Sequence, residues 1–289
     1  MATDRGLLTA LRQRARSGRA TAEGRRAGRA PWWRRWVFPA ASIAAFLIAW
    51  QLAAVAYRHA SPLTSPSRLP VPLTIASTLA HSGSGFAAAT GSTARGAITG
   101  LLAGVVIAVL LSVLAVSMRW LEDTIYPYLV ASQMVPTIVL APIVLAVVKN
   151  GTVARVIVAA YISFFVIVVN MTKGLKSIHP DQQILLRSLR ARPWQYYTKL
   201  RLPACLPFFF AGLKVAAPLS VVGEIVVELT GSTSGLGYLI LSTQYYGPRY
   251  VTLFWAAMVI TLALGFAFYR AVAVIERRVS PWQHEFRTR

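Results

Sequence analysis

Residues 96–118 read GAITGLLAGVVIAVLLSVLAVSM, a run of 23 residues without a charged side chain. A helix needs about 20 mainly apolar residues to cross the hydrocarbon core of a bilayer. This stretch therefore predicts a membrane-spanning helix. Comparable apolar runs occur at roughly 36–57, 124–148, 152–171, 204–229 and 251–274. The sequence thus predicts an all-α, polytopic membrane bundle of about six spans.

The composition agrees with a membrane protein, because 56% of the 289 residues are hydrophobic and only 13% are charged. The net charge of +21 could also indicate nucleic-acid binding, so the position of the charges has to decide. With a cytoplasmic N-terminus, 23 of the 30 Lys and Arg residues fall in the inner segments 1–35, 118–123, 172–203 and 270–289. Cytoplasmic loops of membrane proteins carry such an excess. The pattern predicts that both termini are cytoplasmic in the cell membrane, and it explains the charge without nucleic acid.

The chain divides into three parts by composition. Residues 1–35 form a basic Arg/Ala/Gly-rich tail, predicted to be disordered and to lie near anionic lipid. Residues 36–278 form the six-span domain, and 279–289 form a cytoplasmic C-terminal tail. Within the domain, the Pro/Ser/Gly-rich segment 58–95 is predicted to be an outer loop with one short helix at LTIASTLAH (73–81).

The long inner loop 172–203 ends in KSIHPDQQILLRSLRARPWQYYTKLRLP and predicts two short helices. Pro180 and Asp181 favour the start of the first helix, Pro193 favours the start of the second, and Pro203 is expected to stop it. Basic and aromatic side chains cover the hairpin. It could rest on lipid headgroups, or it could be a rigid docking element, continuous with the next span, that fits a soluble partner.

The end of this loop resembles the cytoplasmic EAA loop of ATP-binding cassette (ABC) importer permeases. That motif closes with an apolar residue, any residue, and Leu-Pro, here 200–203. The stretch LPFFFAGLKVAAPLSVVGEIVVELTGSTSGLGYLI (206–240) is similar to permeases of the nitrate/sulfonate/taurine type, and most similar to the branch for pyrimidine thiamine precursors and related vitamins. MVPTIVLAPIVLAVV (134–148) and NMTKGLKSIHPD (170–181) also resemble family segments.

The resemblance implies that the hairpin couples to an ATPase. The side chains expected to take part are Arg187, Arg190, Arg192, Trp194, Tyr197, Lys199, Leu202 and Pro203. The chain departs from the motif at its start, where 184–186 read Ile-Leu-Leu in place of Glu-Ala-Ala. It also carries Arg190 where the family has a glycine that permits a left-handed backbone at the turn. An arginine there is expected to cost about 1 kcal/mol in that conformation, or to adopt a different turn.

No GxxxxGK[ST] motif occurs, so we expect ATP and Mg²⁺ to bind a separate ATPase chain and this chain to hold no cofactor. The resemblance implies two ATPase subunits, a second permease copy or paralogue, and an external substrate-binding protein. The chain would then be a non-enzymatic transport subunit. The alternative is a self-sufficient secondary transporter or channel, which would predict internal repeats or intramembrane ion ligands.

Charged residues within a span indicate function by default, and Lys214, Glu224 and Glu228 all fall in the fifth span. We expect the three to lie roughly along one side and to line the translocation pathway. In the alternative, Lys214 extends inward to the interface and Glu228 is only structural.

The segment Gly235, Leu236, Gly237 and Tyr238 predicts a tight external turn, or else a gate or binding-protein contact. The solute is expected to be small and polar: a pyrimidine or vitamin precursor, or else a sulfonate, taurine or nitrate.

Overall fold

The computed structural model describes residues 34–60, 69–245 and 250–280, and these are helical apart from short connections. Two compact units are distinguished, residues 1–60 and residues 61–289. The first contains α2 (Arg34–Ala60), whose segment Ala40–His59 is long and apolar enough to cross a membrane. Most of its large apolar side chains are exposed, as expected of a helix surrounded by lipid.

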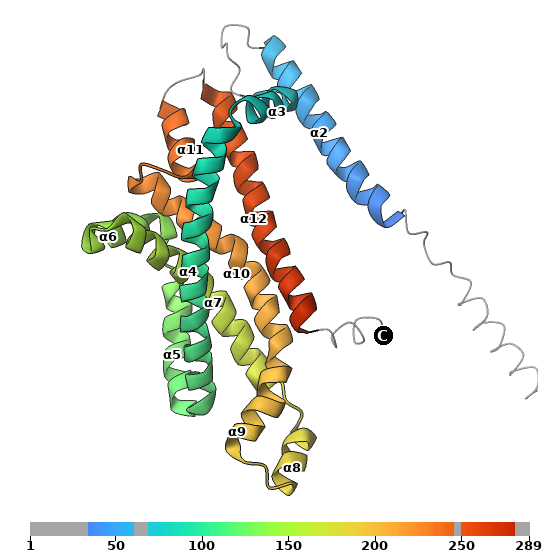
Figure 1. Ribbon diagram of the computed structural model, residues 1–289, viewed down its shortest axis with the longest axis vertical. Coiled ribbons are helices and arrows are strands. Elements are labelled where there is room, and N and C mark those ends of the chain that lie inside the picture. The colour runs from blue at the N-terminus through green and yellow to red at the C-terminus, as the bar shows by residue number, and fades with distance from the viewer. Residues whose placement is uncertain (1–33, 61–68, 246–249, 281–289) are drawn as a thin grey trace, which may run out of the picture. The chain divides into compact units, whose positions relative to one another are not determined.

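The second unit is built on three long helices that pack side by side (Figure 1): α4 (Gly83–Ser117), α7 (Gly151–Lys176) and α10 (Leu202–Gly231). Close packing depends on small residues at the contacts. Gly100 and Gly104 of α4 lie four apart on the face against Ala159 and Ala160 of α7, where a Cβ atom on Gly100 would collide with that helix and one on Gly104 would be tightly packed against it. Small residues at this spacing are typical of membrane helix pairs. A fourth helix, α12 (Val251–Val279), packs against α10.

The described chain thus has five single helices able to span a membrane, four of which match predicted spans closely. The helix α4 is an exception, because it starts at Gly83 and not near 96. Its first 13 residues are rich in Gly, Ser and Thr and were expected to be loop. The Thr90 hydroxyl instead bonds back onto the helix, to the carbonyl of Phe86 at 2.7 Å. The preceding short helix is confirmed as α3 (Pro72–His81).

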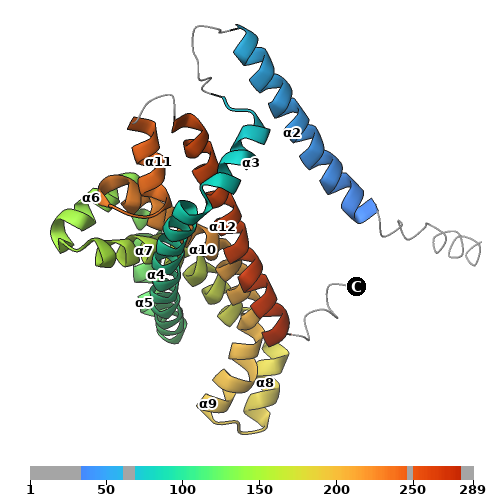
Figure 2. The same ribbon diagram turned by 45° about the horizontal axis from the view of Figure 1, so that its top comes forward.

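The predicted third span, 124–148, is wrong as a single helix. It consists of α5 (Arg119–Ser132) and α6 (Thr137–Val148), which meet at 98° (Figures 1 and 2). Pro136 lies at the break, where it has no N–H to continue the α5 ladder and restricts the residue before it. Lys149 then adopts a left-handed conformation, and the Asn150 side chain accepts the backbone N–H groups that begin α7.

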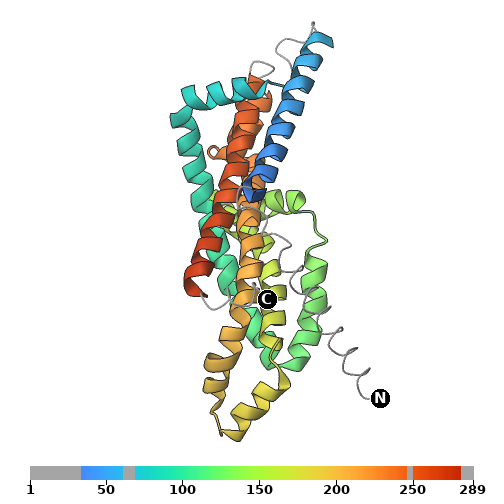
Figure 3. The same cartoon turned by 90° about the vertical axis from the view of Figure 1, so that its right-hand side faces the viewer.

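The inner hairpin is confirmed as α8 (Pro180–Ser188) and α9 (Pro193–Tyr196), at the opposite end of the unit from α3 and α11 (Leu236–Tyr245) (Figures 1 and 3). Arg190 takes the left-handed conformation, with φ 50°, at the place where the family has glycine. Pro203 does not stop the second helix. A π-helical turn, η1 (Tyr197–Arg201), precedes it, and its wider hydrogen bonding carries the chain without a break from α9 into α10.

Candidate functional site

Two carboxylates lie buried in the middle of the core. Glu224 and Glu228 are one turn apart on α10, and both are 0% exposed. A buried pair of like charges is costly unless a cation lies between them. That cation is Arg155, from the second turn of α7, whose Nη1 lies 3.3 Å from Oε1 of Glu224 and 3.7 Å from Oε1 of Glu228. The three side chains form one cluster.

Glu228 is fixed by several further hydrogen bonds. The Thr93 hydroxyl of α4 donates to its two oxygens at 2.9 and 3.0 Å, and the backbone N–H of Gly237 donates at 2.8 Å. The same hydroxyl accepts the N–H of Leu236 at 2.9 Å. Glu228 therefore ties together α4, α10 and the start of α11.

Glycines provide the space for both carboxylates. A Cβ atom on Gly96 of α4 would collide with the carboxylate of Glu224, and one on Gly235 or Gly237 would collide with Glu228. Gly235 also has a φ of +105°, which other residues rarely adopt, whereas Leu236, Gly237 and Tyr238 of the predicted turn lie in the first turn of α11 (Leu236–Tyr245). Glu224 differs from Glu228 in that neither oxygen has a hydrogen-bond partner among the described residues. Its ion pair with Arg155 is the interaction that compensates its burial.

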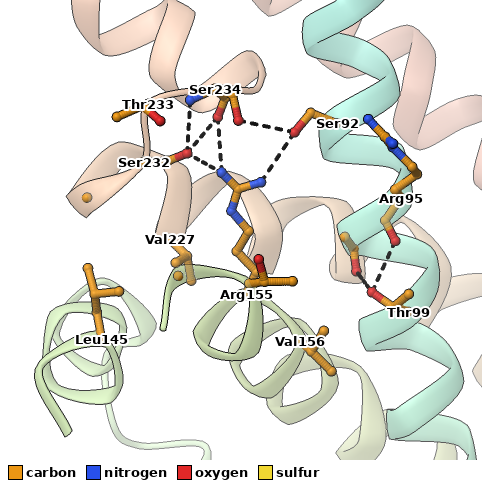
Figure 4. A pocket seen from close by; sticks show the side chains of 14 residues that line it. Ser92, Arg95, Thr99, Leu145, Arg155, Val156, Val227, Ser232, Thr233 and Ser234 are labelled. Carbon is orange, nitrogen blue, oxygen red and sulfur yellow. Dashed lines mark hydrogen bonds between the residues drawn. The ribbon is translucent and has the colours of Figure 1, made fainter. Parts of the chain in front are cut away.

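A polar pocket of about 540 Å³ opens above the cluster (Figure 4). In it the Arg155 guanidinium donates to the hydroxyls of Ser92 and Ser232 and to the carbonyl of Ser234. The pocket is lined by Ser92, Arg95, Gly96, Thr99, Leu145, Gly151, Thr152, Arg155, Val156, Val227, Gly231, Ser232, Thr233 and Ser234. Four separate segments of the bundle meet here: α4, the corner between α6 and α7, the end of α10 and the turn after it.

The hairpin exposes a second candidate surface. Ile184, Leu185 and Leu189 of α8 are each more than 60% exposed, and Trp194 of α9 is 58% exposed. Arg190, Arg192 and Lys199 are also exposed, Leu202 is 42% exposed, Pro203 is half-buried, and the side chain of Arg187 lies outside the described set. Such an apolar patch rimmed by cations is typical of an interaction site.

Tyr197 has a different environment from Trp194. Its hydroxyl lies 3.2 Å from the hydroxyl of Ser117 at the end of α4 and accepts from Arg201 at 2.9 Å. The Arg201 guanidinium also stacks over the rings of Tyr196 and Tyr197. Tyr197 therefore anchors the hairpin to the core, whereas Trp194 points away from it.

A family model described as "Binding-protein-dependent transport system inner membrane component" matches residues 96–281. The chain belongs to this family. It is thus a transmembrane permease of the ABC importer class, in agreement with the resemblance of the EAA-like hairpin.

Individual relatives support the assignment. The formylaminopyrimidine transport permease protein ThiX of Halalkalibacterium halodurans is 35% identical over 176 residues, 59% of this chain and 69% of the relative. The riboflavin transport system permease protein RibX of Chloroflexus aurantiacus is 28% identical over 166 residues, 57% and 62% of the two chains. The putative aliphatic sulfonates transport permease protein SsuC of Bacillus subtilis is 26% identical over 174 residues, 60% and 62%. This chain thus covers less than two thirds of the length of RibX and of SsuC.

Solved structures show the same fold. An amino acid ABC transporter chain superposes with a TM-score of 0.59 at 15% identity, covering 70% of this permease and 97% of that chain. The MetNI methionine ABC transporter gives a TM-score of 0.54 at 20% identity, covering 65% and 92%. These likenesses confirm the all-α permease architecture.

The structure does not bring Lys214 into the cluster that Glu224 and Glu228 form with Arg155, although its spacing of 14 residues, about 3.9 helical turns, leaves it near the direction of Glu228. Lys214 instead pairs with Glu276 of α12, at 3.0 and 2.8 Å from the two carboxylate oxygens. A role of Lys214 in the translocation pathway stays a prediction.

Sequence reasoning missed two residues of the site, Thr93 and Arg155, and it also missed Glu276, the partner of Lys214. Arg155 and Glu276 lie near the ends of apolar runs, where a charge is normally attributed to the membrane surface. Thr93 falls in the segment expected to be loop. One signal was available, because two glutamates in one span require a cation, and Arg155 lies only four residues into the fourth span.

Proposed function

We propose that this permease forms the pathway of an ATP-driven importer and that the pocket above Arg155 is a station for the solute on that pathway. The pocket is polar within an otherwise apolar bundle, and it is lined by residues of four segments. One of these is the turn 232–234, which directly precedes the predicted external gate at residues 235–238. A solute held here would lie beside that gate and against the core.

The inner hairpin is the proposed contact for a separate ATPase, with two ATPase subunits and a second permease completing the membrane assembly. The observation that carries this proposal is the exposed surface of Ile184, Leu185, Leu189 and Trp194, on a hairpin continuous with α10. Closure of the ATPase would move the hairpin and α10 as one body. Because α10 carries Glu224 and Glu228, the same movement would reach the pocket.

The orientation follows from the charges. With the hairpin in the cytoplasm, α3, α11 and the turn 232–235 face the outside, where an external binding protein would deliver the solute. Both termini are then cytoplasmic, as the distribution of Lys and Arg favours.

The proposed solute is a neutral, hydrogen-bonding heterocycle of the aminopyrimidine or related vitamin-precursor class. The positive charge of Arg155 is compensated by Glu224 and Glu228, so the cluster adds no net positive charge to attract an anion. Arg95 is the remaining cation in the pocket lining, beside several hydroxyls. The 35% identity with a formylaminopyrimidine permease supports the same class. An oxyanion such as a sulfonate or nitrate is the second candidate, favoured by Arg95.

Uptake into liposomes with the partner ATPase and binding protein tests the proposal, after thermal shift of the binding protein has been measured with aminopyrimidines, flavins and sulfonates. Thr152→Val removes a pocket hydroxyl at almost constant volume, and we expect severalfold slower uptake of a hydrogen-bonding solute. Arg95→Gln should affect a sulfonate far more than a neutral pyrimidine. Uptake by the permease alone, without ATP, would contradict the proposal.

A further inference from the structure

A second pocket, of about 370 Å³, lies between the middle of α5 and the last turns of α7. It is lined by Asp123, Tyr126, Pro127, Val169, Thr172, Lys173 and Lys176. It shares no residue with the polar pocket above Arg155. The α7 end that contributes to it leads into the inner hairpin, so the pocket lies at the end of the bundle where spans leave the hydrocarbon.

Thr172 in its wall has a buried hydroxyl without a partner. The residue is 5% exposed, and its Oγ1 makes no hydrogen bond in the structure. Among the described residues, the buried hydroxyls of Ser112, Ser163, Ser220 and Thr243 donate to a carbonyl three or four residues earlier, whereas those of Thr172, Thr261 and Ser280 have no partner. A buried hydroxyl that is left unpaired costs stability. Of these three unpartnered hydroxyls, the one of Thr172 belongs to the wall of this pocket.

Charges of both signs surround this hydroxyl. Lys173 and Lys176 on α7 are exposed, and Lys173 forms no ion pair with any described residue. Asp123 faces the pocket from α5 and is exposed as well. The remaining wall, Tyr126, Pro127 and Val169, is mostly apolar and belongs to the parts of α5 and α7 that continue into the bundle. The pocket thus combines cations and a carboxylate at its rim with an apolar surface beside them.

We propose that this pocket binds the headgroup of a membrane phospholipid with a primary amine, of the phosphatidylethanolamine type. The phosphate accepts hydrogen bonds from Lys173 and from the Thr172 hydroxyl, which reaches it once the Thr172 side chain rotates about χ1. Lys176 adds electrostatic attraction. The ammonium donates to Asp123. The acyl chains follow the apolar surface of Tyr126 and Val169 into the bilayer, so α5, the inner half of the broken span, is tied to α7 by lipid.

Native mass spectrometry of the purified, delipidated permease with added lipids tests the proposal. We expect phosphatidylethanolamine to be retained in preference to phosphatidylcholine, whose quaternary ammonium has no N–H for Asp123, and to phosphatidylglycerol, which has no cation. The double variant Thr172→Val/Lys173→Gln should lower retention about tenfold, since it removes one charged and one neutral hydrogen bond. Lys149→Gln, which removes the same charge at the other end of α7, serves as the control and should leave retention unchanged.

Asp123→Asn supplies the sharper arm. It should abolish the preference for phosphatidylethanolamine over phosphatidylglycerol while leaving the phosphate contacts intact. Inorganic phosphate and soluble phosphoethanolamine, added without lipid, distinguish a lipid from a free ligand. Saturable binding of either at micromolar concentration, without lipid retention, would overturn the proposal, as would equal retention of all three lipids by the unaltered permease and the double variant.

Discussion

At the scale of single residues, Arg155 is the side chain on which the stability of the buried carboxylate cluster depends most. It is the cation that lies between two carboxylates that are both fully buried. Replacing one partner of a buried ion cluster leaves the others uncompensated, at a cost of about 3 kcal/mol or more. Arg155→Gln should therefore lower the free energy of unfolding in detergent by about this amount.

Two further variants separate charge from packing. Adding Glu224→Gln to Arg155→Gln removes the carboxylate that has no hydrogen bonds, and we expect it to restore a large part of the loss. Arg95→Gln, in the same pocket but exposed, should cost less than about 0.5 kcal/mol. Equal effects of Arg95→Gln and Arg155→Gln would contradict the assignment of Arg155 to the cluster.

Replacing Gly96 or Gly91 of α4 with alanine should have opposite effects on stability. A methyl group on Gly96 meets the Glu224 carboxylate, whereas one on Gly91 meets nothing within 4 Å. Gly91→Ala should raise stability by up to about 1 kcal/mol through helix propensity, and Gly96→Ala should lower it despite the same gain. Thermal unfolding of the two purified variants measures the difference, and a stabilising Gly96→Ala would show that the carboxylate lies elsewhere.

At this scale the sequence predicted which residues are unusual but not how they pair. Glu224 and Glu228 stand out as charges in an apolar run, and their separation of four residues places them on one face. Thr93 lies 135 residues before Glu228 in the chain, and Arg155 lies 69 residues before Glu224 and 73 before Glu228. These partners are on other helices, whose rotation about their axes depends on packing. Lys214 was grouped with the glutamates because partners on other helices, such as Glu276, could not be considered.

At the scale of helices, apolar length predicts spans well and breaks poorly. The run 124–148 is as apolar as its neighbours, yet it bends by 98° at 133–136. The run contains Pro127, Pro136 and Pro142, but the choice between a kink and a full break depends on which backbone groups find partners in the folded bundle. The start of α4 was missed for a related reason, since Gly- and Ser-rich sequence is stable as a helix there only because it packs against α10 and α11.

The ion pair between α10 and α12 leads to a prediction at this scale. Lys214 and Glu276 have side chains only 15% and 11% exposed, so each is costly without the other. Lys214→Met or Glu276→Gln alone should destabilise the permease by about 2 kcal/mol, and the double variant by less than the sum. Additive losses in a double-mutant cycle of thermal unfolding would show that the pair contributes no coupling.

The hairpin offers two aromatic residues with opposite roles. Trp194→Ala removes an exposed ring, so it should leave unfolding unchanged and greatly reduce the amount of ATPase that copurifies. Tyr197→Phe removes the hydroxyl bonded to Ser117 and Arg201, and it should cost about 1 kcal/mol of stability while ATPase is retained. Unchanged copurification and uptake with Trp194→Ala would favour a hairpin that rests on lipid.

At the scale of the whole molecule, one continuous helical path connects the proposed motor contact with the solute pocket. It runs from Trp194 through η1 into α10 and reaches Glu224 and Glu228 before the external turn. Glu228 then bonds to α11 and α4, so movement of α10 changes both walls of the pocket. In the sequence, the hairpin already read as an element continuous with the next span if it docks a partner. Pro203 was expected to end its second helix, but in the structure a π-helical turn leads from that helix directly into α10.

The central claim is that the α8–α9 hairpin is held by an ATPase on the cytoplasmic side. Site-specific crosslinking from Ser188→Cys, an exposed position at the end of α8 that leaves Trp194 in place, tests it most directly, in a Cys205→Ala background that removes the buried native thiol. In the intact assembly we expect crosslinks to the ATPase chain, together with labelling of the hairpin only from the cytoplasmic side of sealed vesicles. A cysteine that reacts with impermeant reagent from the outside, or that never crosslinks to an ATPase in a transporting assembly, would contradict the account.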